Sequence, residues 1–287
     1  MKGDGIVSGS TASAASAENT LPCTQGTPLS ADMRGEEGAF PAAASADWLA
    51  ARHYAYLLFQ RLLGAEPNRG LFAAIDLAVA REAFGIAAGE AGGSADGMAG
   101  AAADEAAGAE AQGAPLPPAF CALLDVLDEA AQGGEEELRA WKAEYTRLFV
   151  GPAALPAPPW ESVYTSHERL IMQPCTLEVR AAYRERGFEP ALCRHVPDDH
   201  VALELDFLAA LAKDALEAQQ QADAEAARDA LAASSRFLGE HLGAWVGPFA
   251  DEACEKGGSK RYAPVVRALA AFVAADAERL AGAGGNV

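Results

Sequence analysis

The sequence predicts an all-α protein: a single helical-bundle domain of about nine helices. Alanine and other strong helix formers dominate outside the glycine-rich stretches, and β-branched residues are sparse. Apolar residues recur at helical spacing, and glycine or proline follows where the spacing stops. No repeat of fixed period is visible, which argues against a solenoid.

Two segments are expected to lie outside the packed helices. Residues 1–45 consist mainly of Gly, Ser, Thr, Ala and Pro, and we interpret them as a disordered tail without a function of its own. Residues 85–117 are a low-complexity run of Gly, Ala, Asp and Glu without an aromatic residue. Such a run buries too little apolar surface to offset its ordering entropy, so we expect a mobile insertion. The helical domain then covers residues 46–283.

Four helices are expected in the first half of the domain, over residues 47–64, 69–84, 117–133 and 135–150. Asp47 is a plausible N-cap, and Gly151-Pro152 stops the fourth helix. The apolar stripe of that fourth helix consists of Leu138, Trp141, Tyr145, Leu148 and Phe149. We assign Trp141 and Tyr145 to the core.

Five more helices are expected after a proline-rich loop, over residues 162–172, 175–187, 198–220, 223–246 and 260–282. Gly247-Pro248 is expected to break the chain between the last two, because proline lacks the N–H group that a helix interior needs.

The charge balance excludes some classes of partner. A formal net charge of −19 repels nucleic acid and anionic lipid and attracts cationic partners. The five cysteines are odd in number and form no Cys-x-x-Cys pair, so neither a disulfide framework nor a structural zinc site is expected. No secretory signal and no membrane-spanning stretch is evident. We therefore expect a soluble cytoplasmic protein with reduced thiols.

The most informative stretch is the end of the fourth helix and the loop that follows it. The helix ends in Leu148-Phe149, and the loop carries Trp160 and Tyr164. Large apolar side chains on a loop either fill the core or present a surface to a partner, because loops are usually polar. The residues alone leave both interpretations open.

Glu204 lies within the apolar face of the helix expected over 198–220. A buried carboxylate needs a partner, and the candidates are His200, one turn earlier, or an arginine from another helix. The pair can be a structural network, a titratable pair at a binding groove, or part of a metal site. Asp198 and Asp199 can cap this helix, or Asp199 can offer its carboxylate to a cation on a ligand.

No enzyme motif is present. Ser162 and Ser166 lack a Gly-x-Ser-x-Gly elbow, and the run 257–260 lacks the spacing of a phosphate loop. We expect no catalytic residue, cofactor or metal. A helical metal-dependent hydrolase that uses Glu204, His200 and acids from another helix is the alternative from a different class.

Three motifs occur in order, over residues 145–164, 197–208 and 237–249. They begin with Tyr-Thr-Arg-Leu-Phe-Val-Gly-Pro and Pro-Pro-Trp-Glu-Ser-Val-Tyr, continue with Pro-Asp-Asp-His, and end with Phe-Leu…His-Leu…Trp. Together they resemble the signature of the TorD/DmsD family of redox-enzyme maturation chaperones, over residues 46–282. The tail and the insertion depart from the compact family pattern, which leaves the exact client open.

The resemblance implies a TorD-like fold and a cytoplasmic chaperone rather than an enzyme. Family members bind the twin-arginine leader of molybdopterin enzymes related to dimethyl sulfoxide and trimethylamine N-oxide reductases, and hold the apoenzyme until its cofactor is inserted. By resemblance, the leader-binding surface is lined or supported by Leu148, Phe149, Pro159, Trp160, Ser162, Tyr164, Asp199 and His200. A structural network around it comprises Glu204, Gly151, Pro152 and Trp245.

The physics agrees with such a partner. An acidic protein steers the cationic start of a leader, and Asp199 or Glu161 can pair with a leader arginine. The apolar segment of the leader is expected to enter a groove built from Trp160, Tyr164, Leu148 and Phe149. Of these, Trp160 and Tyr164, with Ser162, are the better candidates for direct contact. A nitrate-reductase-type assembly chaperone is the related alternative, and a monomer and a domain-swapped dimer both stay open.

Overall fold

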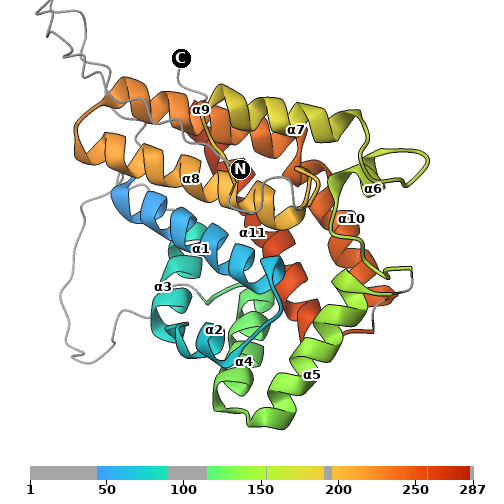
Figure 1. Ribbon diagram of the computed structural model, residues 1–287. Coiled ribbons are helices and arrows are strands. Elements are labelled where there is room, and N and C mark those ends of the chain that lie inside the picture. Colours follow the sequence, from blue (N-terminus) through green and yellow to red (C-terminus); the bar gives the residue numbers. More distant parts are fainter. Residues whose placement is uncertain (1–43, 90–114, 153, 191–195, 257, 285–287) are drawn as a thin grey trace, which may run out of the picture. The chain divides into compact units, whose positions relative to one another are not determined.

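The computed structural model describes residues 44–89, 115–152, 154–190, 196–256 and 258–284. In these residues the chain forms eleven α-helices, one π-helix and no β-strand, so the predicted all-α class is confirmed (Figure 1). The chain divides into two units, residues 1–37 and 38–287, and the first lies wholly outside the described residues.

The elements in chain order are α1 Ala46–Gly64, α2 Arg69–Ala73, α3 Leu77–Ala87, α4 Pro118–Gln132, α5 Glu135–Tyr145, the π-helix η1 Thr146–Val150, α6 Glu161–Thr165, α7 Pro174–Glu185, α8 Val201–Gln220, α9 Ala224–Glu240, α10 Leu242–Glu255 and α11 Tyr262–Gly284. Helix α1 packs along α8 and α3, α8 packs on α9, and α11 packs on α10 and α4 (Figure 1). Helices from opposite ends of the sequence therefore build one apolar core.

A fully buried ion pair joins α1 to α11. Arg52 donates from Nε and Nη2 to the two carboxylate oxygens of Asp276, at 2.6 and 2.9 Å. The hydroxyl of Tyr56 donates to the same carboxylate at 2.6 Å. All three side chains are buried. A buried charge is tolerated only when it is paired and hydrogen-bonded, so this triad makes the packing of α1 on α11 specific.

The N-terminal boundaries differ from the prediction. Ser45, not Asp47, caps α1, because its Oγ accepts from the backbone N–H of Trp48 at 3.2 Å. The helix predicted over 69–84 is two helices, because Asp76 caps a new helix by accepting from the N–H groups of Ala78 and Val79. Of the predicted tail 1–45, residues 1–43 lie outside the described part.

Only part of the predicted insertion 85–117 can be compared with the structure. Helix α3 continues to Ala87, which is buried, and Leu116 is partly buried against the core. The predicted mobile segment is therefore too long at both ends, because Ala87 and Leu116 at its edges pack against the core. Residues 90–114 lie outside the described part.

Two later predictions were wrong. The helix expected over 162–172 ends at Thr165, and a loop follows until Pro174 begins α7. The break expected at Gly247-Pro248 occurs instead at His241, and Pro248 lies inside α10. Pro248 has no N–H to donate to the carbonyl of Ala244, four residues earlier in the helix. Ala244 is exposed, so water can hydrogen-bond to this carbonyl.

Within the described residues, no helix has the length and hydropathy that crossing a bilayer requires. Cys121, Cys175 and Cys254 are free thiols, while Cys23 and Cys193 lie outside the described part. Trp141 and Tyr145, assigned to the core from the spacing of the fourth helix, are both buried.

Candidate functional site

Two of the sequence motifs lie side by side in the structure. The backbone N–H of Val201 donates to the carbonyl of Pro159 at 2.9 Å, and the N–H of Glu161 donates to the carbonyl of Asp199 at 3.0 Å. Trp160 and His200 form an isolated antiparallel bridge between these two bonds. We call this meeting of residues 158–164 with 197–204 the junction. It joins the loop before α6 to the start of α8.

The acidic residues of the junction serve as caps and anchors. Asp199 is fully buried, and its Oδ2 accepts from the N–H of Ser162 at 2.9 Å, so it caps the short helix α6 and not α8. Asp198 pairs with Arg180 on α7, at 2.5 Å between Nη2 and Oδ2. Its carbonyl accepts from the hydroxyl of Tyr183 at 3.0 Å. The expectation that these two aspartates cap α8 was wrong.

His200 is the N-cap of α8. Its Nδ1 accepts from the backbone N–H of Ala202 at 3.1 Å. The side chain is buried, and this burial lowers the pKa of His200 to about 4 despite the nearby charge of Asp199. The imidazole is therefore neutral at physiological pH, with its proton on Nε2.

The cap makes stability depend on pH. Because the pKa of His200 is about 4 in the folded state and 6.5 in the unfolded state, the unfolded chain takes up the proton first as the pH falls. Its contribution is complete above about pH 6.5 and is lost towards pH 4, by up to about 3 kcal/mol. His200→Asn keeps a capping oxygen but does not titrate. Urea denaturation at several pH values should show wild type losing stability relative to this variant below about pH 6.5. Parallel curves would contradict this role.

A buried acid pair lies behind the junction. Glu204 on α8 accepts from the indole Nε1 of Trp245 at 3.1 Å, and its carboxyl group also interacts with that of Glu161. Burial, and then the negative charge of Glu161, raise the pKa of Glu204 well above its usual range. Glu161 in turn lies 3.1 and 3.3 Å from Nδ1 of His241. The carboxyl group of Glu204 therefore keeps its proton to a higher pH than an exposed glutamate does.

This network corrects the partner expected for Glu204. Neither His200 nor an arginine serves it, because His200 uses its Nδ1 to cap α8. The partners are Trp245 on α10 and Glu161, the first residue of α6, and no helical spacing within 198–220 can indicate either one. The network links Glu161, directly beside Trp160, to Glu204 on α8, to Trp245 on α10 and to His241 between α9 and α10.

The junction offers aromatic surface to solvent at two side chains. Trp160 is partly exposed, and its ring meets that of His200 edge-on at 5.7 Å between centroids. Tyr164 is also partly exposed and stacks on Trp245 at 5.4 Å. The guanidinium of Arg169 lies 5.3 Å from the centre of the Tyr164 ring. These rings are thus held from below by buried partners.

The other residues expected at the binding surface are inside the protein. Leu148 is 0 % exposed and Phe149 6 %, and both lie on η1, whose wider turn directs them into the core. The ring of Phe149 meets that of Tyr262 edge-on at 5.2 Å. Pro159 and Ser162 are buried as well. These four side chains can support the surface, but in this conformation they do not line it.

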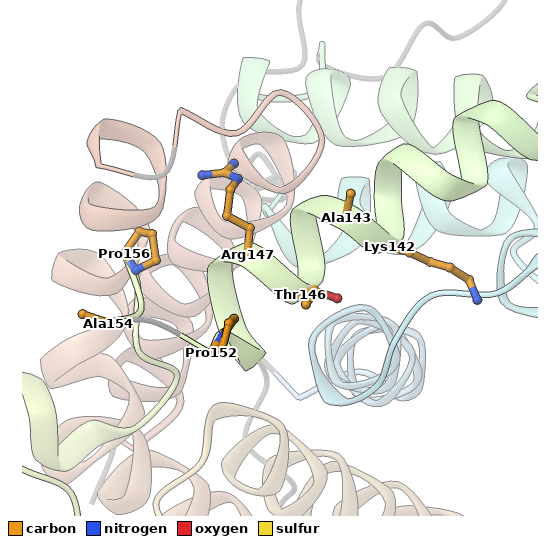
Figure 2. Close-up of a pocket in the computed structure, with 8 residues that line it drawn as sticks. Lys142, Ala143, Thr146, Arg147, Pro152, Ala154 and Pro156 are labelled. Atoms are coloured by element: carbon orange, nitrogen blue, oxygen red, sulfur yellow. The ribbon is translucent and has the colours of Figure 1, made fainter.

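A cavity of about 510 Å³ lies beside η1 and the loop that follows it (Figure 2). It is lined by Lys142, Ala143, Thr146, Arg147, Gly151, Pro152, Ala154 and Pro156. Gly151, with φ of 66°, ends η1 and donates its N–H to Thr146, which turns the chain along the cavity. In Figure 2, Lys142 and Arg147 extend in different directions, and Lys142 is paired with Glu66 at 2.6 Å. Gly151 and Pro152, predicted as structural residues, thus shape the wall of this cavity.

The hydrolase alternative requires His200, Glu204 and acids from another helix to meet at one metal ion. Among the residues that the structure describes, no group of three or more His, Cys, Asp or Glu side chains is placed to hold a metal ion. Of the residues on which this alternative depends, His200 uses its Nδ1 to accept from Ala202, and Glu204 uses its Oε2 to accept from Trp245.

Comparison with known proteins shows what the chain is similar to. The model of the family described as nitrate reductase delta subunit matches residues 114–251, which contain the whole junction. The Tat proofreading chaperone DmsD of Salmonella typhimurium (strain LT2) is 42% identical over 67 residues, 23% of this chain and 31% of that protein. The chaperone protein TorD of Vibrio cholerae (strain ATCC 39315) is 31% identical over 134 residues, 47% of this chain and 59% of that protein. These matches support the resemblance to the TorD/DmsD family of chaperones.

The similarity to individual TorD/DmsD proteins is partial. The chain spans about a third of the length of the DmsD proteins that it matches, at 31%. A TorD of Vibrio vulnificus (strain YJ016) is matched further, over 172 residues that cover 60% of this chain and 78% of that protein, at 26% identity. The similarity to DmsD and TorD proteins agrees with the resemblance that the three motifs predict.

Sequence reasoning missed the residues that connect the motifs. Glu161 and His241 each occur inside a motif, but nothing in their spacing indicates that they meet. The signal that was available is the type of residue: a glutamate between Trp160 and Ser162, within an otherwise apolar run, needs a buried partner. The position of that partner is decided by the packing of α6 against α10.

Proposed function

We propose that this protein is a cytoplasmic chaperone, without catalysis of its own, for a molybdopterin-dependent oxidoreductase of the dimethyl sulfoxide or trimethylamine N-oxide reductase type. It binds the twin-arginine leader and the apo form of that enzyme until cofactor insertion and export. The observation that carries the proposal is the junction: two family motifs pair through their backbones and present Trp160 and Tyr164 at the surface. The relatives named DmsD and TorD are described as chaperones, which supports the same class.

We assign the roles of the site residues by their burial: partly exposed side chains contact the leader, and buried ones support them. Trp160 and Tyr164 contact the leader, because they are the partly exposed aromatic side chains of the junction. Leu148, Phe149, Pro159, Ser162, Asp199 and His200 hold these rings in place from inside the protein. Aromatic side chains supported in this way lose little entropy on binding, which suits them as contact residues.

Electrostatics favours a cationic peptide. The net charge of −19 raises the rate at which a peptide with two arginines meets the protein, and added salt weakens that attraction. Asp199 and Glu161 are buried, so a direct pair between either one and a leader arginine requires the junction to open. In the closed junction, exposed carboxylates such as Glu168 supply the attraction.

A titration tests this proposal. The purified protein is titrated with the leader peptide of the molybdopterin subunit encoded nearest to it, at low and high salt. We expect saturable binding that weakens as salt rises. Replacing both leader arginines by lysine should weaken binding further, because lysine lacks the planar fork that pairs with a carboxylate. Absence of saturable binding at both salt concentrations would overturn the proposal.

A nitrate-reductase-type assembly chaperone is a second candidate, favoured by the description of the matching family model. It differs in its client, a subunit that stays on the cytoplasmic side and is recognised without export. Pull-down of a nitrate reductase catalytic subunit, with no binding of any twin-arginine leader, would favour this candidate. Size-exclusion chromatography with light scattering on the same sample would separate a monomer from a domain-swapped dimer.

A further inference from the structure

The apolar surface closest to the junction is not the groove that the sequence predicts. Two of the four side chains expected to receive an apolar peptide, Leu148 and Phe149, are in the core. Trp160 and Tyr164 are only partly exposed and are already packed against His200 and Trp245. An apolar segment therefore needs additional surface.

That surface follows α6 directly in the chain. Six large hydrophobic side chains are exposed in the described part of the protein, and four of them lie within residues 170–177. These four are Leu170 at 54 %, Ile171 at 47 %, Met172 at 67 % and Leu177 at 62 % exposure. We call them the apolar loop patch. Clustering of exposed apolar side chains, rather than their single occurrence, indicates an interaction surface.

The loop is held in place although its apolar side chains are exposed. Arg169 and Met172 have φ angles of 52° and 61°, which non-glycine residues adopt only at a conformational cost. The guanidinium of Arg169 donates to Glu252 on α10 at 2.8 Å and lies over the ring of Tyr164. Arg169 thus fastens the loop to both α10 and the junction. This bracing keeps the patch next to the exposed rings.

The size and charge of the patch suit one occupant. Its side chains expose on the order of 400 Å², about half of the roughly 800 Å² that each partner of a stable interface buries. A second copy of the chain would thus need further surface, whereas a short apolar segment would not. Exposed Glu168 and Glu178 flank the patch and favour a segment that is cationic at one end. A net charge of −19 opposes an anionic membrane as the partner.

We propose that the apolar loop patch receives the apolar segment of the leader peptide, while Trp160 and Tyr164 contact the part of the leader nearer its arginines. This inference rests on the proposed function and names the subsite for one half of the ligand. The peptide would run from the junction along the loop to the first turn of α7. The apolar half of the leader then binds apolar surface, and the half nearer its arginines binds the aromatic rings of the junction.

The test uses wild type, two variants and two peptides. The triple variant Leu170→Ser, Ile171→Ser, Met172→Ser removes most of the patch, and Val79→Ser, an exposed apolar side chain on α3, is the matched control. The first peptide carries an Arg-Arg pair followed by a Leu/Ala segment of about 12 residues. In the second, Ser and Gln replace the Leu/Ala segment. Fluorescence anisotropy measures binding, and circular dichroism with thermal melting checks that each variant is folded.

We expect the triple variant to bind the first peptide about tenfold or more weakly than wild type, and Val79→Ser to bind it unchanged. Wild type and the triple variant should bind the second peptide with equal affinity. That affinity should be lower than the affinity of wild type for the first peptide. If the triple variant binds the first peptide as wild type does, this subsite is overturned while the proposed function stands. If wild type binds neither the two peptides nor the native leader, both this subsite and the proposed function are overturned. A change in oligomeric state without a change in peptide binding would assign the patch to contact between copies and overturn the inference.

Discussion

Replacing Asp276 with alanine is expected to lower the free energy of unfolding by about 3–5 kcal/mol. The change leaves the guanidinium of Arg52 inside the core without its carboxylate partner, and it removes the acceptor of the Tyr56 hydroxyl. A domain of ordinary stability has only about 5–15 kcal/mol to lose. Urea denaturation followed by circular dichroism should therefore show a large fall in the midpoint.

Two further variants separate the ion pair from a general loss of packing. Glu217→Ala breaks an exposed pair with Lys213 on α8, and its unfolding curve should stay close to that of wild type. The double variant Arg52→Met, Asp276→Leu replaces the pair by apolar side chains and should recover most of the loss. If Asp276→Ala has the midpoint of wild type, the triad does not hold α1 to α11.

Trp160→Ala is expected to weaken leader binding roughly 30-fold or more, the factor that about 2 kcal/mol gives. The ring is partly exposed at the junction, so its removal takes away contact surface without opening a large core cavity. Isothermal titration with the leader peptide measures the affinity. Thermal melting of the same sample should show only a small fall in stability, because the backbone bonds at Pro159 and Glu161 remain.

Trp141→Ala is the matched comparison. Its side chain is 0 % exposed and packs against Phe72 and Tyr262, so we expect a loss of about 3–5 kcal/mol in stability. Leader affinity measured on the folded fraction should be retained. If instead Trp160→Ala collapses the fold and leaves affinity unchanged, the loop before α6 belongs to the core and the proposed contact at Trp160 is wrong.

Much of the helical architecture could be predicted from periodicity and from helix-ending residues. The extent of α8 followed from its apolar face to within a few residues, and α4 ends where Gly133 stands. The errors share one cause. The helix-forming or helix-ending tendency of a residue was outweighed by the hydrogen bonds or the solvent exposure that the residue has in the folded structure. Asp76 gained two backbone N–H partners and divided a predicted helix, while Pro248 stayed helical because its turn faces water.

The site was predicted as a set of residues but not as an arrangement. The motifs contain Trp160, Asp199 and His200, and their resemblance to the TorD/DmsD signature marked them as important. Their spacing does not reveal that Asp199 caps α6 or that the two segments pair through Val201 and Pro159. Hydrogen bonds between residues about forty positions apart depend on how the helices pack, and that information is spread over the whole chain.

The sequence by itself determined the all-α class, the core roles of Trp141 and Tyr145 and the resemblance to the TorD/DmsD family, because composition, helical spacing and short motifs are local properties. Only the tertiary structure decided which apolar side chains are buried and which are exposed. It placed Leu148 and Phe149 inside and left Leu170 and Met172 outside, although all four are large and apolar. The physical reason is that the burial of a side chain depends on which residues of other helices pack against it. The pattern of residues within one segment does not contain that information.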